Sequence, residues 1–152
     1  MSLDKHLYPR LLMIDMTPVG HMSATGQLKQ TFLGDWPPDS FLQFWSLQIS
    51  LNQIRIITLG QSIAESEQKS YSINEALQEA VKFDPAVIYF RPVDMEVLFD
   101  ITELTIQKLK KPLIIHIMDD WPERLRLNDI VKFNHLNSRL KKLIQDLRNF
   151  IK

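Results

Sequence analysis

Short apolar runs alternate with helical segments along this chain, and this alternation limits the folds open to it more than any other feature. Three runs, Arg10–Met16 (RLLMIDM), Ala86–Phe90 (AVIYF) and Leu113–Met118 (LIIHIM), are apolar on both faces and are bounded by turn residues. Such runs are typical of buried strands in a parallel sheet. Two further runs, Phe41–Ile49 and Ile54–Leu59, also have strand composition. We therefore predict a sheet of about five strands.

Helical patterns lie between most of these runs. The first predicted helix has Ser23 as its N-cap and ends near Gly34, and its predicted apolar side is Leu28, Phe32 and Leu33.

The second predicted helix, Ser72–Phe83, opens with a capping box in which Glu75 follows Ser72 by three residues. Its predicted apolar face consists of Ile73, Ala76, Leu77, Ala80 and Val81. A third helix is predicted from a cap at Asp94 to about Leu109, where Pro112 follows.

The resulting order, β-α-β-β-α-β-α-β-α, indicates an α/β fold. We predict a single domain over residues 1–152 with a Rossmann-like, doubly wound, mainly parallel sheet and helices on both faces. Ligands of such sheets bind outside the carboxyl ends of the strands. That rule selects four segments, namely Thr17–Gln27, Gly60–Ser66, Arg91–Asp94 and Asp119–Glu123.

The segment Thr17–Gln27 contains two glycines and enters a helix near Ser23. The free N–H groups and the dipole at a helix start attract anions such as phosphate, and Gly20 would let a ligand approach the backbone closely. Neither G-x-G-x-x-G nor a Walker sequence occurs in the chain. An ordinary turn followed by an N-cap explains the same residues, so both interpretations stay open.

Charged residues follow the fourth and fifth predicted strands. The adjacent Asp119 and Asp120 could hold a metal, orient sugar hydroxyls or act as a base, but Asp120 could equally cap the next helix. Arg91 could pair with a phosphate or carboxylate, or form an ion pair with Asp94 or Asp119. His116 alternates within its predicted strand, and we interpret it as an ordinary residue of the sheet.

The composition excludes several classes of protein. With no cysteine, the chain has no disulfide, thiolate nucleophile or cysteine-based metal site. Lys+Arg and Asp+Glu are both 18, which argues against a nucleic-acid binder. No apolar run is long enough for a membrane span, and the N-terminus has no apolar signal core. The four histidines lack zinc-ligand spacing, and only His21 lies in a position suited to catalysis or sugar contact.

The last segment has an apolar residue at alternating steps of three and four, namely Phe133, Leu136, Leu140, Leu143, Leu147 and Phe150. The basic residues Arg139, Lys141, Lys142, Arg148 and Lys152 are predicted on the opposite side. This pattern predicts an amphipathic helix laid on the sheet. A dimer seam and attachment to an anionic membrane surface are the alternatives.

Two stretches together, GHMSATGQLKQTFLGDWP after the first strand and HIMDDWPERL at the end of the fifth, resemble the N-terminal domain of GT-B glycosyltransferases. The resemblance runs from about Leu11 to Glu123 and is to the retaining enzymes of group 1, or family 4. It implies a domain that receives a carbohydrate or lipid-linked acceptor and faces a second domain that binds a nucleotide-diphosphate sugar. It implies no cofactor and no obligatory metal. The implied location is cytoplasmic, with peripheral membrane contact as a further expectation.

Position by position, the resemblance places a group of loop residues beneath the donor diphosphate and beside the acceptor: Gly20, His21, Met22, Ser23, Gly26 and Gln27. It gives the catalytic positions to Arg91, Asp119 and Asp120, with the two aspartates lining the acceptor side. Enzymes of this group often have a histidine where this chain has Arg91.

The chain ends at Lys152, where the family continues into another strand and a second domain with paired glutamates. The resemblance therefore implies that these 152 residues do not transfer sugar by themselves. The alternative to the transferase is a non-catalytic, flavodoxin-like binding or dimerisation module. A flavin-binding loop would use hydroxyl groups such as those of Thr17, Ser23 and Thr25.

Overall fold

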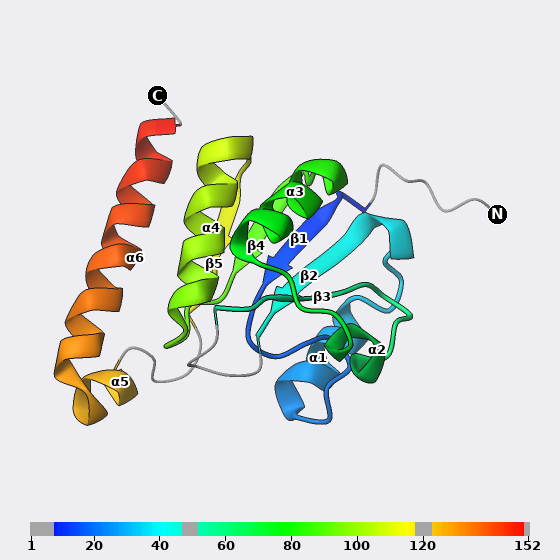
Figure 1. Ribbon diagram of the computed structural model, residues 1–152, viewed down its shortest axis with the longest axis horizontal. Coiled ribbons are helices and arrows are strands. Elements are labelled where there is room, and N and C mark those ends of the chain that lie inside the picture. The colour runs from blue at the N-terminus through cyan, green and yellow to red at the C-terminus, as the bar shows by residue number, and fades with distance from the viewer. Residues whose placement is uncertain (1–7, 47–51, 118–122, 151–152) are drawn as a thin grey trace.

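The computed structural model describes residues 8–46, 52–117 and 123–150. Its elements, in chain order, are β1 (Leu11–Ile14), α1 (Ala24–Phe32), the short 3-10 helix η2 (Pro38–Ser40), β2 (Phe41–Trp45), β3 (Arg55–Ile57), α2 (Ile63–Glu67), α3 (Ile73–Phe83), β4 (Val87–Phe90), α4 (Glu96–Leu109), β5 (Leu113–Ile115), α5 (Glu123–Asn128) and α6 (Ile130–Phe150) (Figure 1).

The five strands form one sheet in the order β3-β2-β1-β4-β5. β1 lies at its centre and pairs in parallel with β2 and β4, and β5 pairs in parallel with β4. β3 is antiparallel to β2, as expected for two strands that follow each other without a helical crossover. The predicted α/β class and mainly parallel sheet are confirmed.

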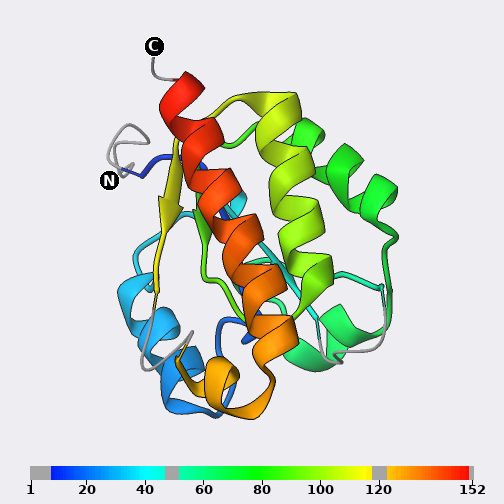
Figure 2. The ribbon, with the colours of Figure 1, turned by 90° about the vertical axis from the view of Figure 1, so that its left-hand side faces the viewer.

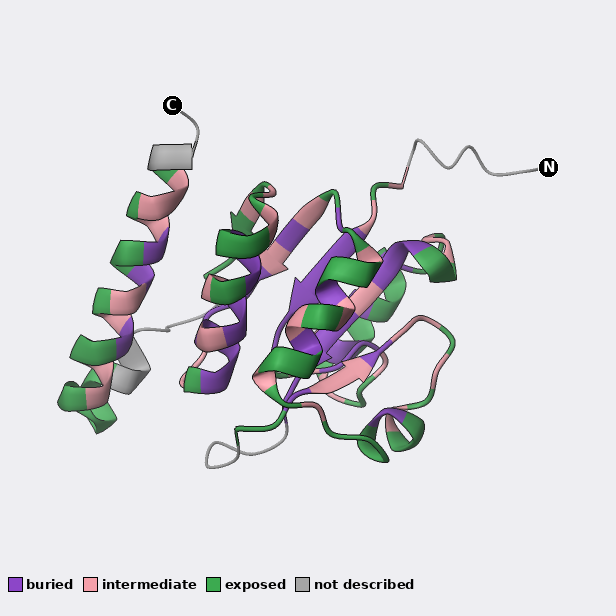
Figure 3. Ribbon diagram, turned by 45° about the horizontal axis from the view of Figure 1, so that its top comes forward, coloured by how far each residue is buried: buried purple, intermediate pink, exposed green. Residues whose placement is uncertain are grey.

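Successive residues of β1 serve the two faces of the sheet. Leu12 and Ile14 belong to a large core cluster with residues of α3, α4 and α6, whereas Leu11 and Met13 belong to a second cluster. The second cluster includes Leu33 at the end of α1. Helices therefore pack on both faces, and the buried residues concentrate in the strands and on the inner sides of the helices (Figure 3).

α6 lies beside α4, at the β5 side of the molecule (Figure 2). Three residues of its predicted stripe, Leu136, Leu140 and Leu143, are buried in the same cluster as α4. The predicted amphipathic helix is confirmed, and these side chains are already occupied within the chain. Dimerisation or membrane contact through this segment stays a prediction.

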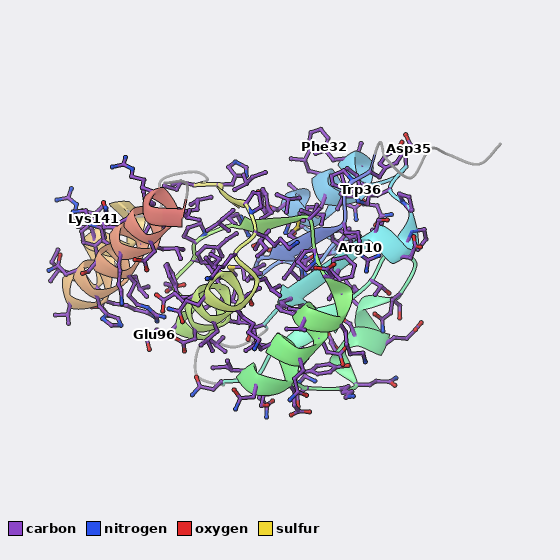
Figure 4. All side chains as sticks on the ribbon, turned by 90° about the horizontal axis from the view of Figure 1, so that it is seen from above. Arg10, Phe32, Asp35, Trp36, Glu96 and Lys141 are labelled. Carbon is purple, nitrogen blue, oxygen red and sulfur yellow. The ribbon has the colours of Figure 1, made fainter. Side chains whose placement is uncertain are left out.

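The charged side of α6 differs from the predicted pattern at Arg139. Its guanidinium bonds Asp100 at 2.6 Å and Glu103 at 3.0 Å on α4, and lies over the Phe99 ring. Hydrogen bonds to these carboxylates raise the pKa of Arg139, against the opposing effect of burial. Lys141, in contrast, points away from the rest of the fold (Figure 4).

The first helix buries a different side from the one predicted. Leu28 is 49% and Phe32 74% exposed, and Phe32 projects from the surface (Figure 4). The buried residues of α1 are Gly26 and Lys29, and Leu33 follows them at its C-cap. The prediction from apolar spacing is wrong here because α1 covers the buried carboxylate of Asp15 and places Lys29 against it.

The remaining corrections concern caps and bounds. Ser23 and the Ser72 capping box are confirmed, but α4 starts after Met95, and Asp94 makes no cap hydrogen bond. Val81, predicted on an apolar face, is 41% exposed. All five strands are shorter than predicted, and the short helix α2 lies where no helix was predicted, between the third predicted strand and the helix that begins at Ser72.

Candidate functional site at the carboxyl edge of the sheet

The candidate site centres on Asp15, which follows β1 and is fully buried. Its Oδ1 accepts a hydrogen bond from Nε of Arg91 at 2.7 Å and forms an ion pair with Nη2 of the same guanidinium, also at 2.7 Å. Its Oδ2 forms an ion pair with the ammonium group of Lys29 on α1. Asp15 thus connects three parts of the fold, namely the end of β1, the helix that crosses one face and the turn after β4.

The two cations around Asp15 are themselves nearly buried. The side chains of Lys29 and Arg91 are each only 10% exposed. Burial lowers the pKa of Lys29, and the positive charge of Arg91 acts in the same direction, whereas Asp15 partly offsets both. Charges removed from water in this way are tolerated only when they are paired and hydrogen-bonded, which these are.

The backbone of the loop after β1 is fixed from several sides. The Thr17 carbonyl accepts from Lys29 Nζ at 2.5 Å and from Gln43 Nε2 at 2.8 Å. Gln43, fully buried on β2, also accepts the Val19 N–H at 3.0 Å. Arg91 Nη2 reaches Thr17 Oγ1 at 3.3 Å. The start of the loop is therefore held in place by side chains of α1, β2 and the β4 turn.

The glycines of the loop are required by its path. Gly20 has a φ of +83°, in the left-handed region that favours glycine. Gly26 lies against the preceding turn, because a Cβ added there would be 2.4 Å from the carbonyl oxygen of His21. The Gln27 side chain donates to that same oxygen at 3.1 Å. The loop thus folds tightly over the first turn of α1.

His21 and Ser23 form the outer part of this loop. Ser23 donates its N–H to His21 Nδ1 at 3.1 Å, so the proton of a neutral imidazole lies on Nε2. The Ser23 hydroxyl accepts the Gly26 N–H at 3.3 Å and caps α1. Within the described residues, the N–H groups of Ala24 and Thr25 have no protein acceptor, as is usual in the first turn of a helix.

Tyr89 and His116 extend the edge toward β5. The Tyr89 hydroxyl is hydrogen-bonded to His116 Nδ1, and the two rings meet edge to face. Burial raises the pKa of Tyr89, the charge of Asp15 adds to this effect, and Arg91 opposes it. His116 was predicted within the fifth strand, but β5 ends at Ile115 and the ring is accessible.

The structure brings together most of the residues selected from the sequence. The group of Gly20, His21, Met22, Ser23, Gly26 and Gln27 lies in one continuous loop and helix start. Arg91 joins it through Asp15 and Thr17. Its pairing with Asp15 was not among the pairings considered from the sequence. Asp119 and Asp120 lie outside the described residues.

The sequence analysis missed Lys29, Gln43 and the Tyr89–His116 pair, and did not single out Asp15. The one available signal was the acid of Asp15 at the end of an otherwise apolar run, LLMID. Nothing local distinguishes Lys29 or Gln43, since their roles depend on contacts with distant segments.

Three comparisons, with protein-family models, with curated proteins and with solved structures, give no significant match. Within the described residues, no group of three or more His, Asp or Glu is arranged to hold a metal ion. No helix of the described part of the chain is long and apolar enough to cross a membrane.

Proposed function

We propose that this chain is the acceptor-side, Rossmann-like domain of a two-domain GT-B glycosyltransferase, which moves a sugar from a nucleotide-diphosphate sugar to a carbohydrate or lipid-linked acceptor. One observation carries the proposal. The glycine loop, residues 17–27, and the β4 turn meet at the carboxyl edge of the sheet, where Arg91 contacts both Asp15 and Thr17. In open α/β sheets, this edge is where ligands bind.

The loop has the features that a diphosphate requires. Gly20 gives the loop its left-handed turn, Gly26 lets the loop fold tightly over the first turn of α1, and within the described residues the N–H groups of Ala24 and Thr25 have no protein acceptor. In the proposed reaction, such N–H groups stabilise the negative charge that develops on the leaving diphosphate. Retention of the anomeric configuration is the expectation that comes with the family.

Arg91 fits this reaction as a positioning residue. Its guanidinium is bound to Asp15 and Thr17, and its side chain is only 10% exposed. Arg91 therefore holds the first residue of the glycine loop in place from the inner side of the loop. His21 is exposed at the same edge and carries its proton on the outward nitrogen, so it suits contact with donor or acceptor hydroxyls.

The test is a nuclear magnetic resonance titration of the isotope-labelled chain with UDP, GDP and ADP, and with the matching nucleosides. We expect at least one diphosphate, and no nucleoside, to shift the amide signals of residues 20–27 in a saturable way. Turnover is not expected, because transfer also depends on a domain that holds the donor in register.

A matched pair of variants sharpens the test. Gly26→Ala should abolish the shifts, since its Cβ would collide with the backbone of His21. Gly34→Ala is the control, because its Cβ would make only ordinary contacts at 3.5 Å. Failure of every diphosphate to shift residues 20–27 would contradict the proposal, as would equal shifts from inorganic phosphate alone. Tight binding of FMN at this loop would favour the flavodoxin-like alternative.

A further inference from the structure

A hollow opens at the start of α4 and α6, and none of its described lining residues belongs to the glycine loop. Its volume is about 580 Å³, within the range of small-molecule sites. Val97, which is 4% exposed, and Val131 supply its apolar lining. The other lining side chains are all polar: Asn52, Asp94, Glu96, Asp129, Lys132 and His135. Glu96 is the first residue of α4, and Figure 4 shows it on the side of this helix toward α6.

Hydrogen-bond donors and acceptors alternate around this hollow. His135 Nε2 on α6 lies 2.8 Å from Glu96 Oε1 on α4. Lys132 Nζ lies 3.6 Å from Asp94 Oδ2, again across the two elements. Glu96 and His135 are 54% and 55% exposed, whereas Lys132 and Asp94 are 26% and 38% exposed, so the first pair in particular is weak and can exchange partners with a ligand.

The lining excludes several kinds of ligand. Within the described residues no set of three carboxylates or histidines is arranged as a metal cage. Three carboxylates outnumber the cationic side chain of Lys132, which disfavours phosphorylated compounds. Among the described residues, the aromatic ring of the lining is the imidazole of His135, which pairs with Glu96, and no Phe, Tyr or Trp of this part of the chain lines the hollow to stack on a nucleobase. The described lining carries both hydrogen-bond donors and acceptors, which suits a small, uncharged molecule that does the same.

We infer that this hollow binds a sugar or a cyclic polyol. Neighbouring hydroxyl groups of such a ring can donate to the two oxygens of Glu96 and accept from His135 and Lys132. The C–H faces of the ring can rest on Val97 and Val131. The inference does not depend on the proposed transferase. If both hold, the hollow gives the acceptor a place next to the β4 turn.

The experiment is a titration of the labelled chain, without nucleotide, against glucose, galactose, mannose, N-acetylglucosamine and myo-inositol. We expect at least one of them to shift the amide signals of residues 94–97 and 130–135 in a saturable way, with a Kd of about 1–10 mM. Glycerol, spermidine and inorganic phosphate serve as comparison probes.

Two Glu→Gln variants distinguish binding at the hollow from a general effect of losing one negative charge. Glu96→Gln should weaken the sugar about tenfold, because it removes a charged acceptor. Glu79→Gln should leave Kd unchanged, since Glu79 lies on α3 and also pairs with an exposed lysine, at 3.6 Å from Lys82. Circular dichroism of both variants should match the wild type.

Three results would overturn the inference. They are no saturable shift with any of the five compounds, stronger binding of spermidine or phosphate at the same residues, and a Kd unaffected by Glu96→Gln. Because nucleoside diphosphates and sugars are titrated separately and report on different residues, failure at the glycine loop and failure at the hollow are distinguishable.

Discussion

Replacing Lys29 with methionine removes one of the two cations that neutralise the buried Asp15. Methionine is similar in length and can fill the same space, so the change mainly deletes a charge. Breaking a buried ion pair by removing one partner costs about 3–5 kcal/mol in general. Here Arg91 continues to bond Asp15, and Gln43 continues to donate to the Thr17 carbonyl. Burial also disfavours the ammonium charge, as its lowered pKa indicates, so we expect a loss below that general range, about 2–3 kcal/mol in the free energy of unfolding.

The assay is urea unfolding at pH 7, followed by circular dichroism. The midpoint should fall while the slope m stays unchanged, because the surface exposed on unfolding is the same. For a chain of this length, the expected loss corresponds to a fall in Tm of about 4–12 °C. Lys82→Met is the matched control, since Lys82 is 76% exposed, and its effect should stay within about 0.5 kcal/mol.

A Lys29→Met protein as stable as the wild type would refute this reasoning. It would mean that the free-energy cost of removing the ammonium group from water equals the free energy gained from its pairing with Asp15, as occurs for some buried ion pairs. A second comparison keeps the test independent of packing. In an Asp15→Asn background, Lys29→Met should cost less than in the wild type, because the partner of the ammonium group is already gone.

Four further outcomes follow from the contacts described above. Gly26→Ala should lower the free energy of unfolding by about 1–3 kcal/mol in urea titrations, whereas Gly34→Ala should change it by less than about 0.5 kcal/mol. Ser72→Ala should cost about 1 kcal/mol in the same assay, because it removes the capping box of α3. Burial lowers the pKa of Lys29, so as pH rises the folded chain releases this proton before the unfolded chain does. The stability of the wild type relative to Lys29→Met should therefore increase as pH rises from that lowered pKa toward 10.5. Burial raises the pKa of Tyr89, so wild type should lose stability relative to Tyr89→Phe as pH rises above 10.0; in either comparison, a slope of the opposite sign would contradict the assignment of that residue.

Features of this fold that depend on a few neighbouring residues could be predicted from the sequence. The Ser72 capping box is one, because Ser72 and Glu75 satisfy each other within one turn. The N-cap at Ser23 is another. Asp94 has an equally suitable side chain, but it pairs with Lys132 of α6 instead. The partner of Asp94 is thus a residue far away in the chain, which the local pattern does not reveal.

The packing of α1 could not be predicted for a related reason. Apolar periodicity assumes that the buried side of a helix is its apolar side. In α1 the buried side includes Lys29, because Asp15 lies beneath it, and Phe32 is left 74% exposed. The pairing of Arg91 with Asp15 is equally non-local, since 76 positions separate the two residues. The sheet order brings them together by placing β4 next to β1.

The cluster of Asp15, Lys29 and Arg91 is also an unusual use of buried space for a fold of this size. An apolar trio of the same volume would often stabilise such a core at least as well, because three charged groups must be removed from water. Places where a chain departs from the most stable choice are commonly places where it acts on a ligand. Here the departure lies at the edge of the sheet where ligands bind, and it fixes Thr17, the first residue of the glycine loop. We therefore infer that the charged cluster holds this loop in one conformation rather than adding stability to the core. A loop that is already ordered before its ligand arrives binds that ligand without the entropic cost of ordering.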